Sequence, residues 1–377
     1  MHAAAVGDMD KTGARADNAA SSDNERDKSL PDQQRQPAPA APVTRVLLIS
    51  DGRPGHYRQS EGVVAALKRR GPVAVDRIEL KTRLPLPKGF IPKLGRLLPA
   101  RSVLRLHGID PDAISRPDLI VSSGGATLGA NVALAKVLDV PNVFSGSTRG
   151  FPLDGFSLVL TPYPSVARPP VVMSGAKPTP FDPDRSPPPR AISTAGAMRA
   201  ARISLLVGGP TPTADFRAGD WVRLAALIEN LIERWDCRVT IATSPRTPDQ
   251  AYAALKPAID RHAGAVSIID FRTAGLGSID AAFDCDVMLV TSDSMSMMTE
   301  AALSRRPAIA LAPEITHAHR DDEAVAGLVA ERWLAVLPLA GLDAQRVAAT
   351  AAKLTPLADN HLDRLASLVA RATRIGA

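Results

Sequence analysis

The sequence has little of the chemistry that disulfide-rich, metal-binding or nucleic-acid-binding proteins need. Only two cysteines occur among its 377 residues, Cys237 and Cys285, and they lie far apart in apolar surroundings. A disulfide framework or a cysteine metal cluster is therefore not expected, and a reducing cytoplasm fits best. Aromatic residues make up only 4% of the chain, so platforms for stacking along single-stranded nucleic acid are scarce and no nucleic-acid partner is expected.

Long apolar runs, glycine fingerprints and metal clusters are missing as well. No uninterrupted apolar stretch approaches the roughly 18 to 20 residues that span a bilayer. The loop after the first predicted strand lacks the G-x-G-x-x-G dinucleotide fingerprint and is not a P-loop. His317 and His319 stand near Asp321 and Asp322, but no second ligand cluster has recognisable spacing, so we predict no metal site.

What is present is typical of a globular protein with two domains. The chain is 45% hydrophobic and 22% charged, and it is long enough for two cores. Its formal charge of +6 favours anionic partners such as nucleotides or phospholipid headgroups. Residues 1–43 are rich in Ala, Asp, Ser, Gln and Pro without apolar periodicity, which predicts a disordered tail rather than a secretory signal or transit peptide.

From Arg45 onward, short apolar runs of strand length alternate with helical segments in two series. Continuous apolar strands between helices indicate parallel sheets covered on both faces. The predicted strands are 46–50, 73–80, 118–122, 142–145 and 157–160, and then 202–207, 238–242, 267–269, 287–291, 308–311 and 335–337. We therefore predict an α/β protein with two doubly wound, Rossmann-like domains facing a cleft.

Prolines mark the expected domain boundary. They break the alternation between residues 162 and 199, where Pro187-Pro188-Pro189 cannot continue a helix or a central strand. The expected organisation is a first Rossmann-like domain at 44–175, a proline-rich linker at 176–200, a second Rossmann-like domain at 201–340 and one or two closing helices within 341–377. Because ligands bind at the carboxyl ends of parallel strands, the loops after strands are the candidate sites.

In the first domain, three glycine-containing loops follow predicted strands. Two glycines in the first loop permit close approach of a ligand to backbone N–H groups, while Arg53 and His56 supply a cation and a base. The second loop, with Gly124 and Gly125, leaves backbone N–H groups free to donate, and the third loop adds the cation of Arg149. Ordinary capped turns are the alternative explanation of these patterns. The candidates are Asp51, Gly52, Arg53, Gly55, His56, Gly124, Gly125 and Arg149.

The second domain offers loops suited to a nucleotide. Gly208 and Gly209 allow a pyrophosphate or ribose near the backbone, and Arg246 suits phosphate oxygens. In segment 291–302, hydroxyls at a helix start favour an anion, and Glu300 suits ribose hydroxyls. A multiply capped helix with a solvated glutamate is the alternative. The candidates are Gly208, Gly209, Thr211, Ser244, Arg246, Ser292, Ser294, Ser296 and Glu300.

Residues 81–109 form a basic and apolar stretch. They include seven Lys or Arg residues and no acid, interleaved with leucines and other apolar residues. Such a stretch suits an anionic membrane surface, although a charged helix face that meets water is the alternative. We therefore expect a cytoplasmic protein with peripheral contact at the inner face of the plasma membrane.

Five motifs together resemble those of the "elongated mitochondria" fission family, whose bacterial members are described as glycosyltransferases. The motifs are DGRPGH at 51–56, SGG at 123–125, GGP at 208–210, TSPRTP at 243–248 and TSDSMSMMTE at 291–300. One departure is Pro245, where a second arginine is expected. The arrangement is similar, more remotely, to the GT-B transferase that adds N-acetylglucosamine to the lipid-linked peptidoglycan precursor.

These resemblances imply a GT-B fold and a metal-independent sugar transfer, with a nucleotide diphosphate sugar as co-substrate and no cofactor. We expect His56 or Asp51 to take the acceptor proton, Glu300 to hold the ribose, and Arg246 and a helix dipole to stabilise the departing diphosphate. The expected acceptor is a lipid-linked or cell-envelope saccharide. The alternatives are a nucleotide-sugar epimerase and a non-catalytic membrane-fission scaffold.

Overall fold

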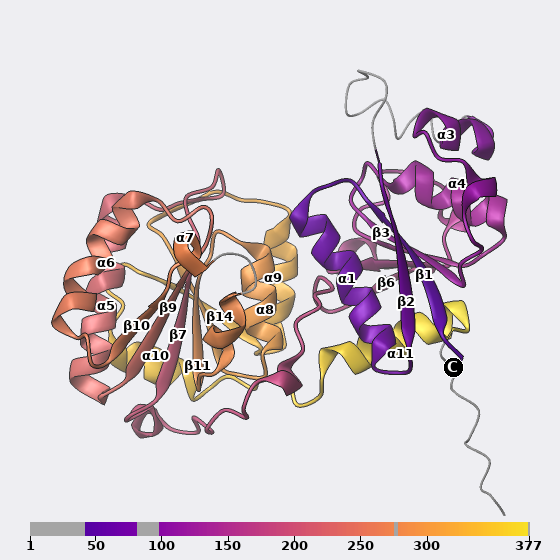
Figure 1. Cartoon of the computed structure of the whole chain (residues 1–377). Coiled ribbons are helices and arrows are strands. Elements are labelled where there is room, and N and C mark those ends of the chain that lie inside the picture. Colours follow the sequence, from indigo (N-terminus) through magenta and orange to yellow (C-terminus); the bar gives the residue numbers. More distant parts are fainter. Residues whose placement is uncertain (1–41, 81–97, 275–277, 376–377) are drawn as a thin grey trace, which may run out of the picture. The chain divides into compact units, whose positions relative to one another are not determined.

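The structure is a computed structural model that describes residues 42–80, 98–274 and 278–375. Within these ranges the chain forms two six-stranded sheets flanked by helices (Figure 1). Neighbouring strands are parallel throughout both sheets. The predicted fold class, with two doubly wound α/β halves, is confirmed. Residues 1–41 of the predicted tail and 81–97 of the basic stretch lie outside the described residues.

The first sheet has the strand order β2-β1-β3-β4-β5-β6. Side chains alternate along its central strands, so Val46 and Leu48 join one apolar core while Leu47 and Ile49 join another. Helices α1 and α11 contribute to the first core, and α3 and α4 to the second. The bounds are β1 Thr44–Ser50, β2 Val73–Glu79, β3 Leu119–Ser123, β4 Asn142–Ser145, β5 Leu158–Thr161, β6 Val171–Met173, α1 Pro54–Lys68, α3 Ala100–Leu106, α4 Leu128–Leu138 and α11 His361–Thr373.

Strand β6 falls inside the stretch in which prolines were expected to end the alternation, so that expectation is wrong for residues 171–173. The strand is three residues long, follows Pro169-Pro170 and pairs with β5 at the edge of the sheet. An edge strand needs a hydrogen-bonded neighbour on one side only, and prolines next to it therefore do little harm. A run this short leaves almost no periodic signal.

The second sheet has the strand order β10-β9-β7-β11-β12-β14. Leu205 and Val207 pack in one core with α5 and α10, and Leu206 packs in the other with α8 and α9. The bounds are β7 Arg202–Val207, β9 Arg238–Thr243, β10 Val266–Ile269, β11 Val287–Thr291, β12 Ala308–Ala312, β14 Leu334–Pro338, α5 Ala218–Trp235, α6 Asp249–Arg261, α7 Phe271–Ala274, α8 Met295–Leu303, α9 Asp321–Ala330 and α10 Ala344–Ala351. Two short strands, β8 Ala214–Asp215 and β13 Ile315–Thr316, pair antiparallel beside it.

Each sheet reverses its strand order once. In the first sheet the order turns at β1, which lies between β2 and β3, and in the second at β7, which lies between β9 and β11. Loops that leave two such neighbouring strands run in opposite directions, and this reversal is where open α/β sheets bind ligands at the carboxyl ends of their strands. The loops after β1 and β3, and after β7 and β11, therefore hold the candidate site.

The two closing helices belong to different sheets. Helix α10 packs in a core of the second sheet, and α11 returns to the first sheet, where Leu362, Leu365 and Val369 join the core beside α1. At the start of α11, His361 is buried with Nε2 2.8 Å from the carbonyl oxygen of Phe181. A buried imidazole thus ties the start of α11 to the segment that contains Phe181.

Acidification should weaken the protein through His361. Burial lowers its pKa to about 4, below the usual 6.5. Between pH 6.5 and 4 the unfolded chain binds a proton here that the folded protein does not, so the free energy of unfolding should fall by up to about 1.4 kcal/mol per pH unit. Urea unfolding at several pH values measures this slope. The His361→Gln variant should show a flatter profile, and identical profiles would contradict the expectation.

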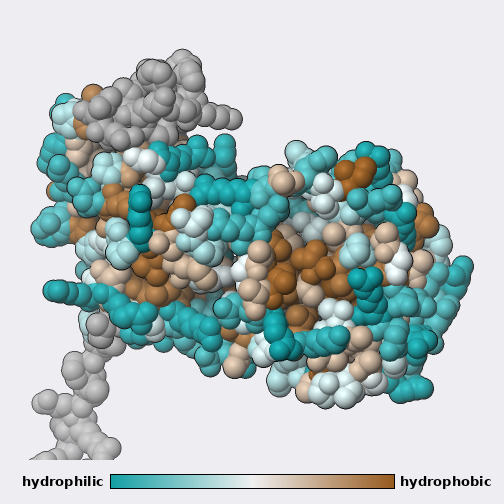
Figure 2. All heavy atoms as spheres, turned by 180° about the vertical axis from the view of Figure 1, so that it is seen from behind, coloured by the Kyte–Doolittle hydropathy of each residue, from teal (hydrophilic) through white to brown (hydrophobic). Residues whose placement is uncertain are grey.

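The face of the molecule seen in Figure 2 carries both polar and apolar areas. Hydrophilic side chains cover most of the face shown in Figure 2, and apolar residues gather in limited areas. Among the described residues, the large apolar side chains that reach the surface include Met173, Val222 and Val329. No helix in the described part of the chain combines the length and apolar character needed to cross a membrane.

Candidate functional site

The loop after β1 carries a hydrogen-bonded aspartate–histidine pair. Helix α1 begins at Pro54, whose fixed backbone angle suits a first helical turn. The short connection places Asp51 Oδ2 2.8 Å from His56 Nδ1. The Asp51 side chain is only 7% exposed, and its other oxygen accepts a hydrogen bond from the Arg53 backbone N–H. The carboxylate is thus fixed, while the imidazole, at 30% exposure, reaches solvent.

The loop after β3 lies against the His56 ring. Gly124 has a φ of +90°, and a Cβ atom there would lie 2.1 Å from His56 Nδ1. A Cβ atom on Gly125 would lie 2.5 Å from Nε of Arg149, which follows β4. At Gly124 the positive φ and the ring together require glycine, whereas at Gly125 a side chain would displace the end of Arg149. The loops after β1, β3 and β4 therefore meet, and they bring together Asp51, His56, Gly124, Gly125 and Arg149.

The side chains or Cα atoms of three other candidates from the first domain do not take part in the contacts between these loops. One residue that does take part was not predicted. Gly52 adopts a φ of +76° near the Glu79 side chain, while Gly55 borders open space and Arg53 is exposed. The missed residue is Gln59, whose Oε1 accepts hydrogen bonds from the hydroxyls that end β3 and β4, those of Ser123 and Ser145. Its position three residues after His56 on α1 was the available signal, because that spacing shares a helix face.

In the second sheet, the glycine loop after β7 packs against a buried carboxylate. A Cβ atom on Gly208 would lie 2.2 and 2.3 Å from the two side-chain oxygens of Asp293, and one on Gly209 would lie 2.0 Å from the Arg246 carbonyl oxygen. The Gly209 N–H donates to Asp293 Oδ2 at 3.2 Å, and the Gly208 N–H donates to Thr291 Oγ1 at 2.8 Å. These glycines therefore make room for the neighbouring loops.

Asp293 is the central residue that the sequence analysis missed. Its side chain has no exposed surface, and it accepts hydrogen bonds from Thr291 Oγ1 at 2.6 Å and Arg246 Nη2 at 2.7 Å. Burial raises its pKa, although these hydrogen bonds and the arginine charge oppose the shift. The available signal was its place two residues after a buried strand, in a loop at the ligand-binding edge of the sheet.

The Arg246 side chain contacts this buried carboxylate and is also partly exposed to solvent. Its side chain is 45% exposed although one guanidinium nitrogen contacts Asp293. The loop is fixed by Ser244 Oγ, which accepts from the Arg246 N–H at 3.2 Å, and by Thr247 Oγ1, which donates to the Val207 carbonyl at 2.8 Å. A guanidinium has five N–H donors, so several are left for an anion.

Some of the predicted hydroxyl residues accept hydrogen bonds from the backbone, and others are left to contact a ligand. Ser294 caps α8, because its Oγ accepts a hydrogen bond from a backbone N–H of the first turn. Thr211 Oγ1 accepts a backbone hydrogen bond that closes the turn before β8. Ser292 is half-buried and Ser296 is exposed. Only the last two therefore remain open to a ligand through their hydroxyls.

A cavity of about 450 Å³ lies next to Asp293. Its volume is in the usual range for small-molecule sites, about 300–1,000 Å³. Its lining includes Ser292, Asp293, Met295, Met298, His317 and His319. His319 Nδ1 accepts a hydrogen bond from the Asp321 N–H at the start of α9. Across the described ranges, no three His, Cys, Asp or Glu side chains are grouped so that they would hold a metal ion.

Glu300 connects the two groups of loops. Its side chain is 8% exposed, so the alternative of a solvated glutamate is wrong. Oε1 accepts hydrogen bonds from Arg58 Nη2 at 2.5 Å and from Thr179 Oγ1 at 3.0 Å. Arg58, which the sequence analysis also missed, lies on α1 two residues after His56. This ion pair therefore ties the helix that carries the histidine to the helix that follows Asp293.

The fold is similar to solved structures at low sequence identity. The UDP-GlcNAc 2-epimerase from Methanocaldococcus jannaschii is 13% identical with a TM-score of 0.49, covering 87% of this chain and 98% of that chain. MurG of Acinetobacter baumannii is 13% identical, with a TM-score of 0.45 and coverages of 88% and 95%. The E. coli ADP-heptose LPS heptosyltransferase II is 15% identical with a TM-score of 0.44, covering 86% of this chain and 99% of that chain. A search of curated proteins finds no match.

The family match is more extensive. A family model described as mitochondrial fission ELM1 matches residues 54–372, which include the β3, β4, β7, β9 and β11 loops of the candidate site. The family resemblance drawn from the five motifs is thereby confirmed. The chain belongs to the mitochondrial fission ELM1 family.

Proposed function

We propose that this protein is a glycosyltransferase that binds a nucleoside diphosphate sugar at the β7/β11 edge and transfers the sugar to an acceptor hydroxyl at the β1/β3 loops. One observation carries the proposal. An exposed arginine, Arg246, is anchored at the strand-order reversal on the buried Asp293, and Asp293 also lines a cavity of about 450 Å³. A fixed cation at such an edge suits a diphosphate.

The donor is held by groups that the fold has already positioned. Arg246 offers its remaining N–H donors to the diphosphate, and the backbone N–H groups at the start of α8 add a favourable dipole. Glu300 lies one turn further along α8 and bonds ribose hydroxyls through Oε2, because its described partners, Arg58 and Thr179, both occupy Oε1. Ser292 and Ser296 supply further hydroxyls.

His56 is the base in this proposal, and Asp51 is the residue that orients it. The bond between Asp51 and Nδ1 fixes the ring and leaves Nε2 to take the proton of the acceptor hydroxyl. Asp51 itself is too buried to meet an acceptor. As the sugar–phosphate bond breaks, Arg246 and the α8 N-terminus stabilise the departing diphosphate without a metal ion. The acceptor class we propose is a lipid-linked or cell-envelope saccharide.

Thermal unfolding with a panel of nucleotides tests the donor site. We expect one of UDP, GDP, CDP or ADP, or its sugar, to stabilise the protein by about 2.7 kcal/mol at a concentration 100 times its Kd. Glu300→Ala should reduce that shift, because the ribose loses its acceptor. Glu331→Ala, which removes an exposed acid just after α9, is the matched control and should behave like the wild type.

The same nucleotides and nucleotide sugars distinguish the glycosyltransferase from a scaffold and from an epimerase, by the thermal shift and by the products formed. If no nucleotide shifts the melting temperature, a non-catalytic scaffold becomes the better description. If a nucleotide sugar is converted to its epimer without any acceptor, the protein is an epimerase. An unchanged shift in Glu300→Ala would remove that residue from the donor site.

A further inference from the structure

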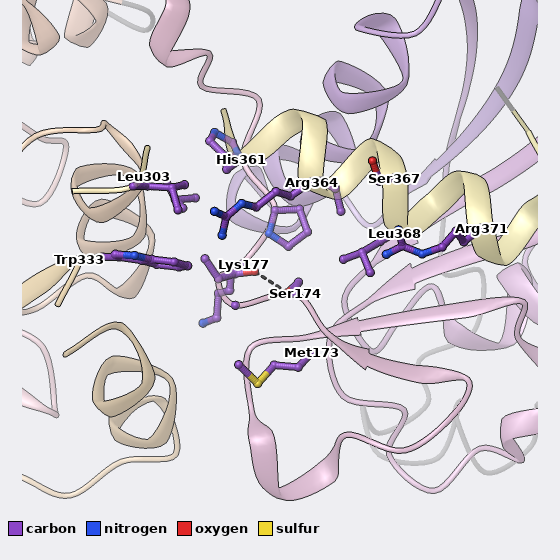
Figure 3. A pocket seen from close by; sticks show the side chains of 15 residues that line it. Met173, Ser174, Lys177, Leu303, Trp333, His361, Arg364, Ser367, Leu368 and Arg371 are labelled. Atoms are coloured by element: carbon purple, nitrogen blue, oxygen red, sulfur yellow. Dashed lines mark hydrogen bonds between the residues drawn. The ribbon is translucent and has the colours of Figure 1, made fainter. Parts of the chain in front are cut away.

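A second cavity, of about 430 Å³, lies between the segment 173–178, helix α11 and the end of α8. Figure 3 shows Leu303 and Trp333 on one side of it and Arg364 and Leu368 of α11 on the other. It shares no lining residue with the cavity beside Asp293. The proposed sugar transfer does not use it.

The walls of this cavity are largely apolar. Leu303 and Leu357 are almost fully buried at its base, and the ring of Trp333 lies 3.6 Å from the position that a Cβ atom on Gly175 would take. Met173, which is 42% exposed, lies at the solvent side. Such a lining favours a hydrocarbon ligand, because it removes apolar surface from water.

The charged side chains that line the cavity are all basic. Its fifteen lining residues include Lys177, Arg364 and Arg371 but no acid. Lys177 is engaged by Asp321 at 3.0 Å, and Arg364 contacts the exposed Asp359 at 3.1 Å. Within the part of the chain that the structure describes, Arg371 has no hydrogen-bond or ion-pair partner. An exposed pair such as Arg364–Asp359 is weak. The Arg364 guanidinium also lies 5.8 Å from the centre of the Trp333 ring, a contact that leaves its N–H groups, like those of Arg371, able to donate to an anion.

Helix α11 presents these arginines by its periodicity. Arg364, Leu368 and Arg371 follow the spacing i, i+4, i+7 and line the cavity, whereas Leu362 and Val369 on another face are buried in the core of the first sheet. One face of the helix thus fixes it in the fold. The other places two guanidinium groups on either side of an apolar side chain.

We propose that this cavity binds a single-chain amphiphile with a phosphate head group. The chain lies against Trp333, Leu303, Leu357 and Leu368, and the phosphate bonds to Arg364 and Arg371. Two guanidinium groups suit a phosphate head group, which has several oxygens, better than they suit a single carboxylate head group. The volume of about 430 Å³ is sufficient for one alkyl chain.

Tryptophan fluorescence of the full chain tests this proposal with dodecyl phosphate, kept below its micelle concentration. Trp333 lines the cavity, whereas Trp221 is fully buried on α5 in a core of the second sheet and Trp235 ends α5. We expect a saturable change in emission that Trp333→Phe removes. Inorganic phosphate and dodecyltrimethylammonium, which lack the chain or the anion, should each cause none.

Variants then assign the head-group site. Arg364→Ala and Arg371→Ala should each weaken dodecyl phosphate binding by roughly 10-fold, the usual effect of losing one charge-assisted hydrogen bond. Arg346→Ala, an exposed arginine on α10, is the matched control and should bind like the wild type. Urea unfolding checks that each variant is folded.

Several results would overturn the proposal. Equal binding of dodecyltrimethylammonium would show that the cavity does not select anions, and full affinity in both arginine variants would show that the head lies elsewhere. Binding to vesicles of phosphatidylglycerol without binding to monomeric dodecyl phosphate would indicate a membrane surface instead. Nucleotide-induced thermal shifts should be unaffected in the arginine variants, so this proposal and the sugar-transfer proposal fail independently.

Discussion

Replacing His56 by alanine should lower the rate of sugar transfer by about 10²- to 10⁴-fold, the usual contribution of a general base. The Nε2 atom is the proton acceptor in our proposal, and Asp51 is too buried to replace it. Release of the nucleoside diphosphate from the donor sugar in the presence of acceptor measures the rate. The thermal shift caused by the nucleotide should be unchanged, because the donor loops belong to the other sheet.

Two further variants make this prediction specific. Asp51→Asn keeps the shape of the side chain but loses the charge that orients and supports the imidazolium, so it should lower the rate as well and alter the pH profile. His262→Ala, outside the site at the end of α6, is the matched histidine control and should leave the rate unchanged. Near-wild-type transfer by His56→Ala would show that another group is the base.

The Gly208→Ala variant should destabilise the protein by about 1–3 kcal/mol, the usual cost of overpacking, and should lose the nucleotide-induced thermal shift. The new methyl group would lie 2.2 Å from a carboxylate oxygen of Asp293. That carboxylate has no exposed surface and is held by Thr291, Gly209 and Arg246, so it cannot move away without breaking those bonds. Urea unfolding measures the loss of stability.

A control and a rescue accompany this variant. Gly327→Ala adds a methyl group in open space inside α9 and should stabilise the helix by about 0.5–1 kcal/mol. The double variant Gly208→Ala/Asp293→Ala removes the clashing carboxylate and should recover part of the lost stability, which would reveal direct coupling. Wild-type stability of Gly208→Ala would show that the loop has more room than the structure indicates.

Much of the fold follows from local sequence patterns. The strands at 142–145, 202–207 and 287–291 were predicted with their observed bounds, because continuous apolar runs between helices signal buried parallel strands. The strands that were not predicted, β6, β8 and β13, have only two or three residues each. The candidate loops could be located for the same reason, because a loop after a buried strand opens at the ligand-binding edge of its sheet.

The partners of the candidate residues could not be read from such patterns. Gly208 packs on Asp293, 85 positions later, because β7 and β11 are neighbours, and nothing in local periodicity gives strand order. Arg58 on α1, a helix of the first sheet, forms an ion pair with Glu300, so an acid that its sequence position suggested to be solvated is buried.

The sequence by itself determined the two α/β halves, the loops that hold the candidate site and the family, since each depends on residues close together in the chain. The tertiary structure alone decided which residues of those loops touch one another, that His56 is oriented by Asp51, and that α11 returns to the first sheet and closes a second cavity. The physical reason is that strand order and long-range packing place side chains from distant segments in contact, and burial then sets their charges and hydrogen bonds.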